Sequence, residues 1–345
     1  MKPSIHVLMT GAGAPGAAGI IQCLLQDPVI QLSVADADEG AVGRHLHDRF
    51  YLLPKGDAEN FAAEVLALCK RENIDIVLPL VTKELFPLSR YKEEFNKAGV
   101  QVLVSSHSAI QTANDKGACY RFLSEKGIPV PQFHLVHTTE EFIHAAFELG
   151  HPQQSFCFKP TVANGSRGFR IVSDSINEAE HLFHQKPYNT FITYTHALKI
   201  LSSQPFPPLV VTEYLPGDEY SVDCLADKGK ALLVVPRLRQ KMINGISVQG
   251  RFEKDEAIIA YCTQIIEAIG LHGNIGIQVK RNAYGQPLLL EINPRVQGTI
   301  VAGLGAGVNL PVLALRNAMG LPLAEEAMQV RWGTSFMRYW TEVFY

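Results

Sequence analysis

The sequence predicts an N-terminal doubly wound parallel α/β domain followed by an α+β region built on antiparallel sheets. In about the first hundred residues, short apolar runs alternate with helical patterns, which is typical of a parallel sheet. Beyond about residue 110 this alternation ends, and short β segments with helices between them indicate an α+β region. A chain of 345 residues is long enough for two or three domains, each with its own core.

In the N-terminal region the expected elements follow a βα order. The expected strands are residues 5–9, 32–35, 76–80 and 100–104, and the expected helices are 16–26 and 58–72. The first turn, Gly11-Ala-Gly13-Ala-Pro-Gly16, fits the GxGxxG pattern, and Asp36 ends the second strand. Such glycines let backbone approach a pyrophosphate, and an acid can hold the ribose, so a Rossmann NAD(P)-dependent oxidoreductase is an alternative. A glycine turn needed only for strand-to-helix packing explains the pattern about as well, and Pro15 is unusual in the dinucleotide motif.

The second region begins with a helix expected over residues 108–127, which contains Asp115 and Lys116. Two prolines make residues 128–131 an extended connector, and the change of pattern predicts a domain boundary near residue 110. The expected strands beyond it are 156–159, 169–172, 209–213, 220–226, 231–236, 275–280 and 288–292. Residues 184–208, rich in aromatic residues, Thr and Pro, stay unassigned, with a lobe-joining insertion as one alternative.

Composition and charge exclude several classes of protein. The formal net charge is −3 and no run of five Lys and Arg occurs, which argues against a nucleic acid or an anionic membrane as partner. The six cysteines include no CxxC pair, so we expect no zinc site. The start of the sequence lacks a signal-peptide pattern, and no apolar run reaches the roughly 20 residues that span a bilayer. We therefore expect a cytoplasmic protein.

Polar side chains follow the last two expected strands. Folding that hairpin symmetrically about residues 284–285 places Gln278 opposite Glu291, and the period-2 alternation puts Glu291 and Asn293 on one face, beside Arg295. Magnesium takes carboxylate and amide oxygens and leaves positions for waters and phosphate oxygens. The pattern favours a site for nucleotide-bound magnesium, and the alternative is a solvated hairpin with an ordinary ion pair.

The string Glu291-Ile-Asn293-Pro-Arg295, preceded by Gln278, resembles the magnesium-binding signature of ATP-grasp enzymes, in particular the carbamoyl-phosphate synthetase large-subunit group. The resemblance covers about residues 110–320. It implies that Gln278, Glu291 and Asn293 hold one or two Mg²⁺ ions, or Mn²⁺ in their place, that bridge the ATP phosphates. It also implies that Arg295 faces the transferred phosphate or the acyl phosphate.

The resemblance also implies a two-lobed ATP-grasp domain with antiparallel sheets behind an N-terminal α/β domain. We expect the N-terminal domain over residues 1–110, a small lobe with the phosphate loop over 111–205, and a large lobe with the magnesium site over 206–345. In this family the N-terminal domain helps to bind the acceptor substrate. Glu84 is placed similarly to an acid found near the substrate in some members.

A lysine, a Gly-Ser loop and a further strand at residues 156–172 are similar to the ATP-grasp phosphate loop. The resemblance implies that these residues contact the phosphates through Lys159, Gly165, Ser166 and Gly168. It implies a second phosphate or nucleotide contact at Lys116, which by itself reads as a surface helix lysine. A hairpin turn without function is the alternative for the loop, and no GxxxxGK[ST] motif of a P-loop NTPase occurs.

The stretch around a Pro-Gly turn at residues 210–223 resembles the family's adenine hinge. The resemblance implies that Glu213 and the backbone at Tyr214 and Leu215 meet the adenine, and that Glu219 meets the ribose. A plain hairpin with a solvated acidic tip is the alternative.

Arg237 and Arg239 occupy alternate positions of one strand and so project the same way. With Arg295 they suit a substrate carboxylate and transition-state phosphoryl charge, because the guanidinium fork matches both groups. A solvent-exposed basic face is the alternative for this pair.

The resemblance implies an ATP- and Mg²⁺-dependent carbon-nitrogen ligase that activates a carboxylate as an acyl phosphate and joins it to an amine, releasing ADP and phosphate. Its partners would be small-molecule carboxylates and amines, with no nucleic acid and no membrane, and a homodimer stays open. Carboxyphosphate, carbamate or thioester chemistry is the nearest alternative. An inactive nucleotide-binding module and the oxidoreductase are more distant ones.

Overall fold

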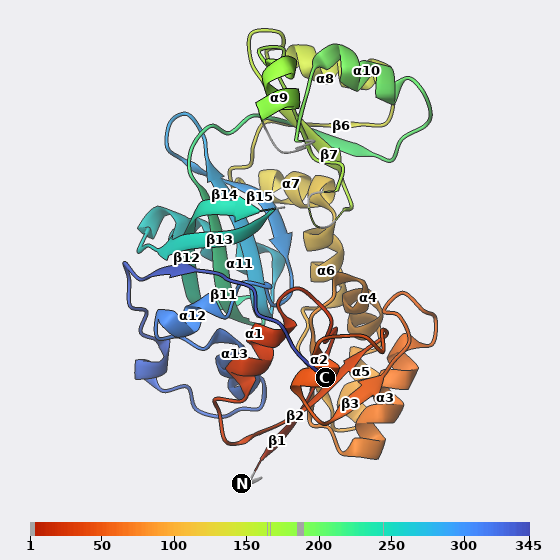
Figure 1. Cartoon of the computed structure of the whole chain (residues 1–345), viewed down its shortest axis with the longest axis vertical. Coiled ribbons are helices and arrows are strands. Elements are labelled where there is room, and N and C mark those ends of the chain that lie inside the picture. Colours follow the sequence, from red (N-terminus) through yellow and green to blue (C-terminus); the bar gives the residue numbers. More distant parts are fainter. Residues whose placement is uncertain (1–3, 164, 166, 185–189, 244) are drawn as a thin grey trace. The chain divides into compact units, whose positions relative to one another are not determined.

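A computed structural model describes residues 4–163, 165, 167–184, 190–243 and 245–345. The chain folds as two units (Figure 1). Unit 1 consists of Met1–Ala113, Glu219–Val279 and Leu290–Tyr345, and unit 2 consists of Asn114–Asp218 and Lys280–Leu289. Unit 1 therefore joins segments that are far apart in the sequence.

The N-terminal part of unit 1 is a five-stranded parallel sheet with strand order β3-β2-β1-β4-β5. The strands are β1 (Ile5–Thr10), β2 (Ile30–Asp36), β3 (Phe50–Leu52), β4 (Ile76–Pro79) and β5 (Gln101–Val102). The helices are α1 (Ala17–Leu24), α2 (Gly43–Leu46), α3 (Phe61–Glu72), α4 (Thr82–Arg90) and α5 (Lys92–Lys97). Helix-covered faces on both sides explain the nearly unbroken apolar runs of β1 and β4, and the predicted parallel α/β class is confirmed.

The second sheet of unit 1 has six strands in the order β15-β14-β11-β12-β13-β16. The strands are β11 (Glu219–Asp227), β12 (Lys230–Ile243), β13 (Ile246–Phe252), β14 (Gly273–Arg281), β15 (Pro287–Asn293) and β16 (Ser335–Met337). The helices are α11 (Glu256–Ile269), α12 (Ala302–Gly305), α13 (Leu310–Ala318) and the 3-10 turn Glu325–Met328. The pairs β11·β12, β12·β13 and β13·β16 are antiparallel, as predicted for this region.

Unit 1 has one apolar core that both of its sheets share. It includes Val7 and Met9 of β1, Val235 of β12, and Ile300 and Leu313 near the C-terminus. A second cluster, around Leu8, Val77 and Phe95, lies among β1, β4 and helices α3 to α5. Buried apolar side chains therefore hold the N-terminal sheet against the six-stranded sheet. The removal of apolar surface from water is the dominant driving force of folding, and it has no preferred direction.

Unit 2 is built on a five-stranded sheet with order β6-β10-β7-β8-β9. The strands are β6 (Phe133–Val136), β7 (Phe156–Pro160), β8 (Arg170–Val172), β9 (Phe191–Ile192) and β10 (Leu209–Glu213). The helices are α7 (Lys116–Glu125), α8 (Thr139–Glu148), α9 (Glu178–His184) and α10 (Tyr194–Leu201). Phe142, Phe156 and Val211 belong to its core.

Two expectations about this part of the chain are wrong. The single helix predicted over residues 108–127 is two helices, α6 (His107–Asn114) and α7, because Asp115 has extended backbone (φ −100, ψ 111) and caps α7 by accepting from Ala118 N at 2.9 Å. The described part of residues 184–208 is no lobe-joining insertion, since β9 pairs with β8 and α10 packs on the same sheet.

No helix in the described part of the chain has the length and apolar character needed to cross a membrane.

Candidate active site

The end of β15 carries a row of three polar side chains. Asn293 Nδ2 donates to Glu291 Oε1 at 3.3 Å, and Arg295 Nη2 donates to Asn293 Oδ1 at 3.4 Å. Glu291 and Asn293 therefore lie on one face, as the period-2 alternation predicts. The opposite face at Ile292 is buried in apolar surroundings, so the polar row is separated from the core.

Arg295 is anchored on the first residue of helix α4, in the N-terminal part of the same unit. Its Nε donates to Thr82 Oγ1 at 3.1 Å, and its Nη1 donates to Val296 O at 2.8 Å. Burial lowers the pKa of Arg295, and the carboxylates of Glu291 and Glu84 oppose that shift. Sequence reasoning missed Thr82. Its position just beyond β4 could have indicated it, because ligands in α/β folds bind outside the carboxyl ends of parallel strands.

A second hydrogen-bonded group joins three of the predicted site residues. Arg239 Nη1 donates to Glu219 Oε1 in a short contact and to Gln278 Oε1 at 3.5 Å. Only 3% of the Arg239 side chain is exposed. The alternative of a solvent-exposed basic face is therefore wrong for Arg239.

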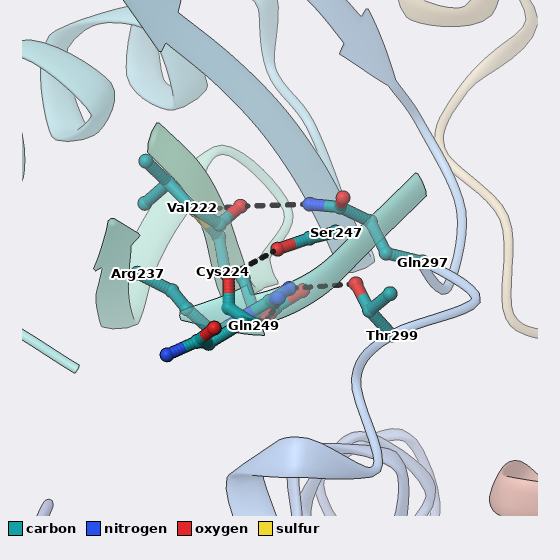
Figure 2. Close-up of polar contacts among 8 residues, drawn as sticks. Val222, Cys224, Arg237, Ser247, Gln249, Gln297 and Thr299 are labelled. Carbon is teal, nitrogen blue, oxygen red and sulfur yellow. Dashed lines mark hydrogen bonds and ion pairs between the residues drawn. The ribbon is translucent and has the colours of Figure 1, made fainter. Parts of the chain in front are cut away.

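The neighbouring arginine, Arg237, is completely buried. Its Nη2 donates to Asp223 Oδ2 at 3.0 Å, and its guanidinium lies 5.2 Å from the centre of the Phe336 ring. The same Nη2 donates to Thr299 Oγ1 at 2.7 Å (Figure 2). Burial raises the pKa of Asp223, while the charge and hydrogen bonds of Arg237 oppose the shift. The exposed basic face is wrong for Arg237 too, and its partners are protein side chains.

The glycine turn after β1 packs against another segment of the protein. A Cβ on Gly16 would lie 2.3 Å from Gly298 Cα, so the two backbones are in direct contact. Asp36 Oδ2 accepts from Gly13 N at 2.7 Å, and the cavity beside the turn measures about 220 Å³. Ligand pockets typically hold about 300–1,000 Å³, so this space is small for a dinucleotide. The geometry favours a structural role for Gly16, which lets this turn pack on the loop after β15.

Glu84 lies buried at the carboxyl ends of β1 and β4. Its Oε2 accepts from Thr10 Oγ1 at 2.7 Å and from Val81 N at 3.3 Å. Burial raises the pKa of Glu84 to about 7, and the charge of Asp36 adds to the shift. A carboxyl group with this pKa can bind or release a proton near neutral pH.

In unit 2, Lys116 opens α7 and lies buried. Its Nζ donates to Ala163 O at 2.7 Å, in the loop between β7 and β8. It is therefore no surface helix lysine. Gly165 and Gly168 of that loop have left-handed backbone (φ +64 and +75), which glycine adopts without strain, while Ser166 lies outside the described residues. Lys159 belongs to β7, as predicted.

The predicted adenine hinge lies at the end of β10 in unit 2. Glu213 Oε1 accepts from Gln132 N at 2.8 Å, and the Lys280 ammonium lies 5.3 Å from the Tyr214 ring centre. Leu215 is buried. Glu213 thus has a backbone partner in the connector before β6, a contact that sequence reasoning missed.

The side chains in unit 1 that could bind a metal ion offer mainly oxygen atoms. Among the described residues no group of three or more His, Cys, Asp and Glu side chains could hold a metal ion. Any metal at β14 and β15 would therefore be held by a mixture of carboxylate and amide oxygens, which suits a hard cation and not zinc.

The chain matches two known families along its length. Residues 7–103 match the family described as PylC-like, N-terminal domain. Residues 205–338 match the family described as ATP-grasp in the biosynthetic pathway with Ter operon. The chain therefore carries an ATP-grasp domain over residues 205–338, behind a PylC-like N-terminal domain over residues 7–103.

Similar proteins agree with this assignment. The carbamoyl phosphate synthase large chain of Thermomicrobium roseum is 28% identical over 249 residues, which are 69% of this chain and 20% of that protein. The carboxyaminoimidazole ribonucleotide synthase of Aspergillus clavatus, solved with ATP, superposes with a TM-score of 0.70 at 18% identity, covering 96% of this chain and 81% of that one. The L-amino acid ligase of Bacillus licheniformis gives 0.65 at 18% identity, with coverages of 96% and 78%. The chain spans about a fifth of the length of the curated relatives it matches.

Proposed function

We propose that this protein is an ATP- and Mg²⁺-dependent, ADP-forming ligase that joins a small-molecule carboxylate to an amine. The observation that carries the proposal is the row Glu291, Asn293 and Arg295, in which a carboxylate, an amide and a guanidinium are linked side by side at the end of β15. A cation ligand set next to a fixed guanidinium suits a polyphosphate, because both neutralise its charge.

The residues of β14 and β15 fit a magnesium ion. Glu291, Asn293 and Gln278 would supply oxygen ligands, few enough to leave positions for water and phosphate oxygens. Bound Mg²⁺ would balance the charge of the ATP phosphates, and Mn²⁺ could take its place. Glu291 Oε1 and Gln278 Oε1 already contact side-chain donors, so both oxygens are held in place before a metal arrives.

In the proposed reaction a carboxylate oxygen attacks the γ-phosphorus of ATP, the bond to the bridging oxygen of ADP breaks, and an acyl phosphate forms. Arg295 stabilises the negative charge on the transferred group, because a buried guanidinium acts in a medium of low dielectric. An amine then attacks the acyl carbon, phosphate leaves, and the amine loses a proton. Glu84, with its pKa near neutrality, is a candidate acceptor for that proton.

The residues of unit 2 enter as separate proposals. Lys116 and Lys159 would contact phosphates, and the loop with Gly165 and Gly168 would cover them, as would Ser166. The backbone at Tyr214 and Leu215, with Glu213, would bind adenine. Substituting each of these residues separately would test its proposed contact with phosphate or adenine.

The relatives narrow the substrate class. Carbamoyl phosphate synthase, carboxyaminoimidazole ribonucleotide synthase and L-amino acid ligase are the names of similar proteins. We propose an organic acid such as an amino acid as the activated carboxylate, and a carboxyphosphate formed from bicarbonate as the second candidate. A homodimer and a cytoplasmic location stay predictions.

Binding and turnover test the proposal in sequence. Mg-ATP should raise the melting temperature of the protein while NAD(P) leaves it unchanged. ADP release should then depend on an acid and an amine from a panel of amino acids, amines and bicarbonate. Glu291→Gln should lower kcat by ~10²-fold or more, about 3 kcal/mol, while the exposed-residue control Glu256→Gln should not change it. A folded Glu291→Gln variant with wild-type turnover would contradict the assignment.

A further inference from the structure

The loop that follows β15, residues 294–301, is attached to the six-stranded sheet by two of its side chains. Gln297 Nε2 donates to Val222 O at 3.2 Å, and Thr299 Oγ1 accepts from Arg237 Nη2 at 2.7 Å. Figure 2 shows both side chains reaching from the loop to strands β11 and β12. Both are buried, so solvent does not compete for these hydrogen bonds. The loop is therefore fixed at two points only two residues apart.

Arg237 is a rigid donor for Thr299. Its Nε and Nη2 both donate to Asp223 Oδ2, at 3.3 and 3.0 Å, and the Phe336 ring packs against its guanidinium. A planar guanidinium held by a carboxylate keeps one orientation, because rotation would break both bonds together. The position of the Thr299 hydroxyl is consequently set by strand β12 and not by the loop itself.

A glycine in β14 makes room for the other attachment. A Cβ on Gly276 would lie 2.1 Å from Gln297 Cγ, so the Gln297 side chain crosses β14 where that strand has no side chain. Any larger residue at this position would push Gln297 away from Val222. In the sequence Ile-Gly-Ile-Gln, the glycine is Gly276, and its lack of a side chain leaves room for Gln297 of the neighbouring loop.

In the sequence, Arg295 lies between strand β15 and the two residues, Gln297 and Thr299, that attach the loop to the six-stranded sheet. Its backbone N–H donates to Asn293 O at 2.7 Å, and Gln297 O accepts from Ile300 N at 3.1 Å, so the loop backbone is closed on both sides of it. Its guanidinium contacts Thr82 and Asn293 at 3.1 and 3.4 Å. A shift of the loop would move this guanidinium relative to both partners.

We propose that Arg237, held by Asp223, acts together with Gln297 to position residues 294–301 and thereby orients Arg295. Arg237 is on this account a positioning residue, whereas the sequence pattern suggested a direct substrate contact. The inference rests on the proposed function, in which Arg295 stabilises phosphoryl charge. The attachment of the loop to the sheet can be tested by hydrogen exchange without any substrate.

The test compares Thr299→Val, which removes the hydroxyl at constant shape, with Thr299→Ser, which keeps it. Lys241→Met, on an exposed position of β12, is the matched control. Hydrogen exchange of residues 294–301, the Kd for Mg-ATP, and kcat for ADP release are measured on each full-length variant. In Thr299→Val we expect faster exchange confined to this loop and kcat lowered ~10-fold at an unchanged Kd, because misplacement by 1 Å can cost ~10²-fold. Thr299→Ser and Lys241→Met should behave as wild type.

Unchanged exchange of the loop in Thr299→Val would overturn the inference, as would a wild-type kcat. A role in stability alone would lower the melting temperature of Thr299→Val and leave its kcat at the wild-type value, which would also overturn the inference. If Thr299→Val does not fold, Gln297→Met removes the second attachment and is judged by the same measurements. A wild-type protein that neither binds Mg-ATP nor releases ADP would refute the proposed function, while loop exchange would still decide whether Arg237 holds the loop.

Discussion

Removing Asp223 probes how much of the stability of unit 1 depends on a buried ion pair. Asp223 Oδ2 lies 3.0 Å from Arg237 Nη2, and the two side chains are 2% and 0% exposed. Asp223→Ala would leave the Arg237 guanidinium buried without a carboxylate partner among the described residues. Breaking a buried pair from one side costs about 3–5 kcal/mol, since the remaining charge is neither hydrated nor compensated. That is a large part of the 5–15 kcal/mol typical of a folded protein.

The measurement is urea unfolding of the wild type, Asp223→Ala and the double variant Asp223→Ala/Arg237→Met. Replacing both members of a buried pair by apolar groups is often neutral, so the double variant should recover much of the loss. Glu256→Ala, which breaks the exposed contact with Lys254, is the control and should cost under about 1 kcal/mol. A loss below 1 kcal/mol for Asp223→Ala, or a double variant less stable than the single one, would refute the reasoning.

Three further substitutions test other parts of the structure. Burial raises the pKa of Glu84 from 4.5 to about 7, so the unfolded chain loses this proton first and stability should fall as pH rises from 4.5 to about 7. The free energy of unfolding of the wild type should fall by about 3 kcal/mol over that range, and Glu84→Gln should abolish this fall. Urea unfolding midpoints measured at several pH values would detect or disprove the difference. Gly16→Ala should cost about 1–3 kcal/mol, because the added Cβ would overlap the Gly298 backbone; a melting temperature equal to wild type would contradict this packing. Asp115→Ala should cost about 1 kcal/mol through loss of the α7 cap, with Asp115→Asn as the conservative control in the same unfolding assay.

Local patterns predicted most of the strands and the row at the end of β15. The alternation of Glu291, Ile292 and Asn293 predicts which side chains share a face, and the hydrogen bond between Glu291 and Asn293 agrees with it. Strand β13 was missed, although its apolar residues Ile246, Val248 and Phe252 alternate and the dipeptide Asn244-Gly245 before them favours a hairpin turn in the sequence.

The same alternation was insufficient for the arginines of β12. It correctly gives Arg237 and Arg239 one direction, but it cannot say that Arg237 meets Asp223 and Thr299 while Arg239 meets Glu219 and Gln278. Those partners depend on which strands neighbour β12 and on where the loop after β15 returns. Lys116 is a similar case, because its burial comes from a loop 47 residues further along the chain.

By itself the sequence determined the two sheet classes, the ATP-grasp signature and the shared face of Glu291 and Asn293, because each depends on residues within one or two turns or strands of each other. The tertiary structure alone decided that Arg295 meets Thr82, 213 residues away, and that Gly16 packs on Gly298. These contacts arise from a core that both sheets of unit 1 share. Packing of distant segments is set by the sum of many apolar contacts, so no short pattern encodes it.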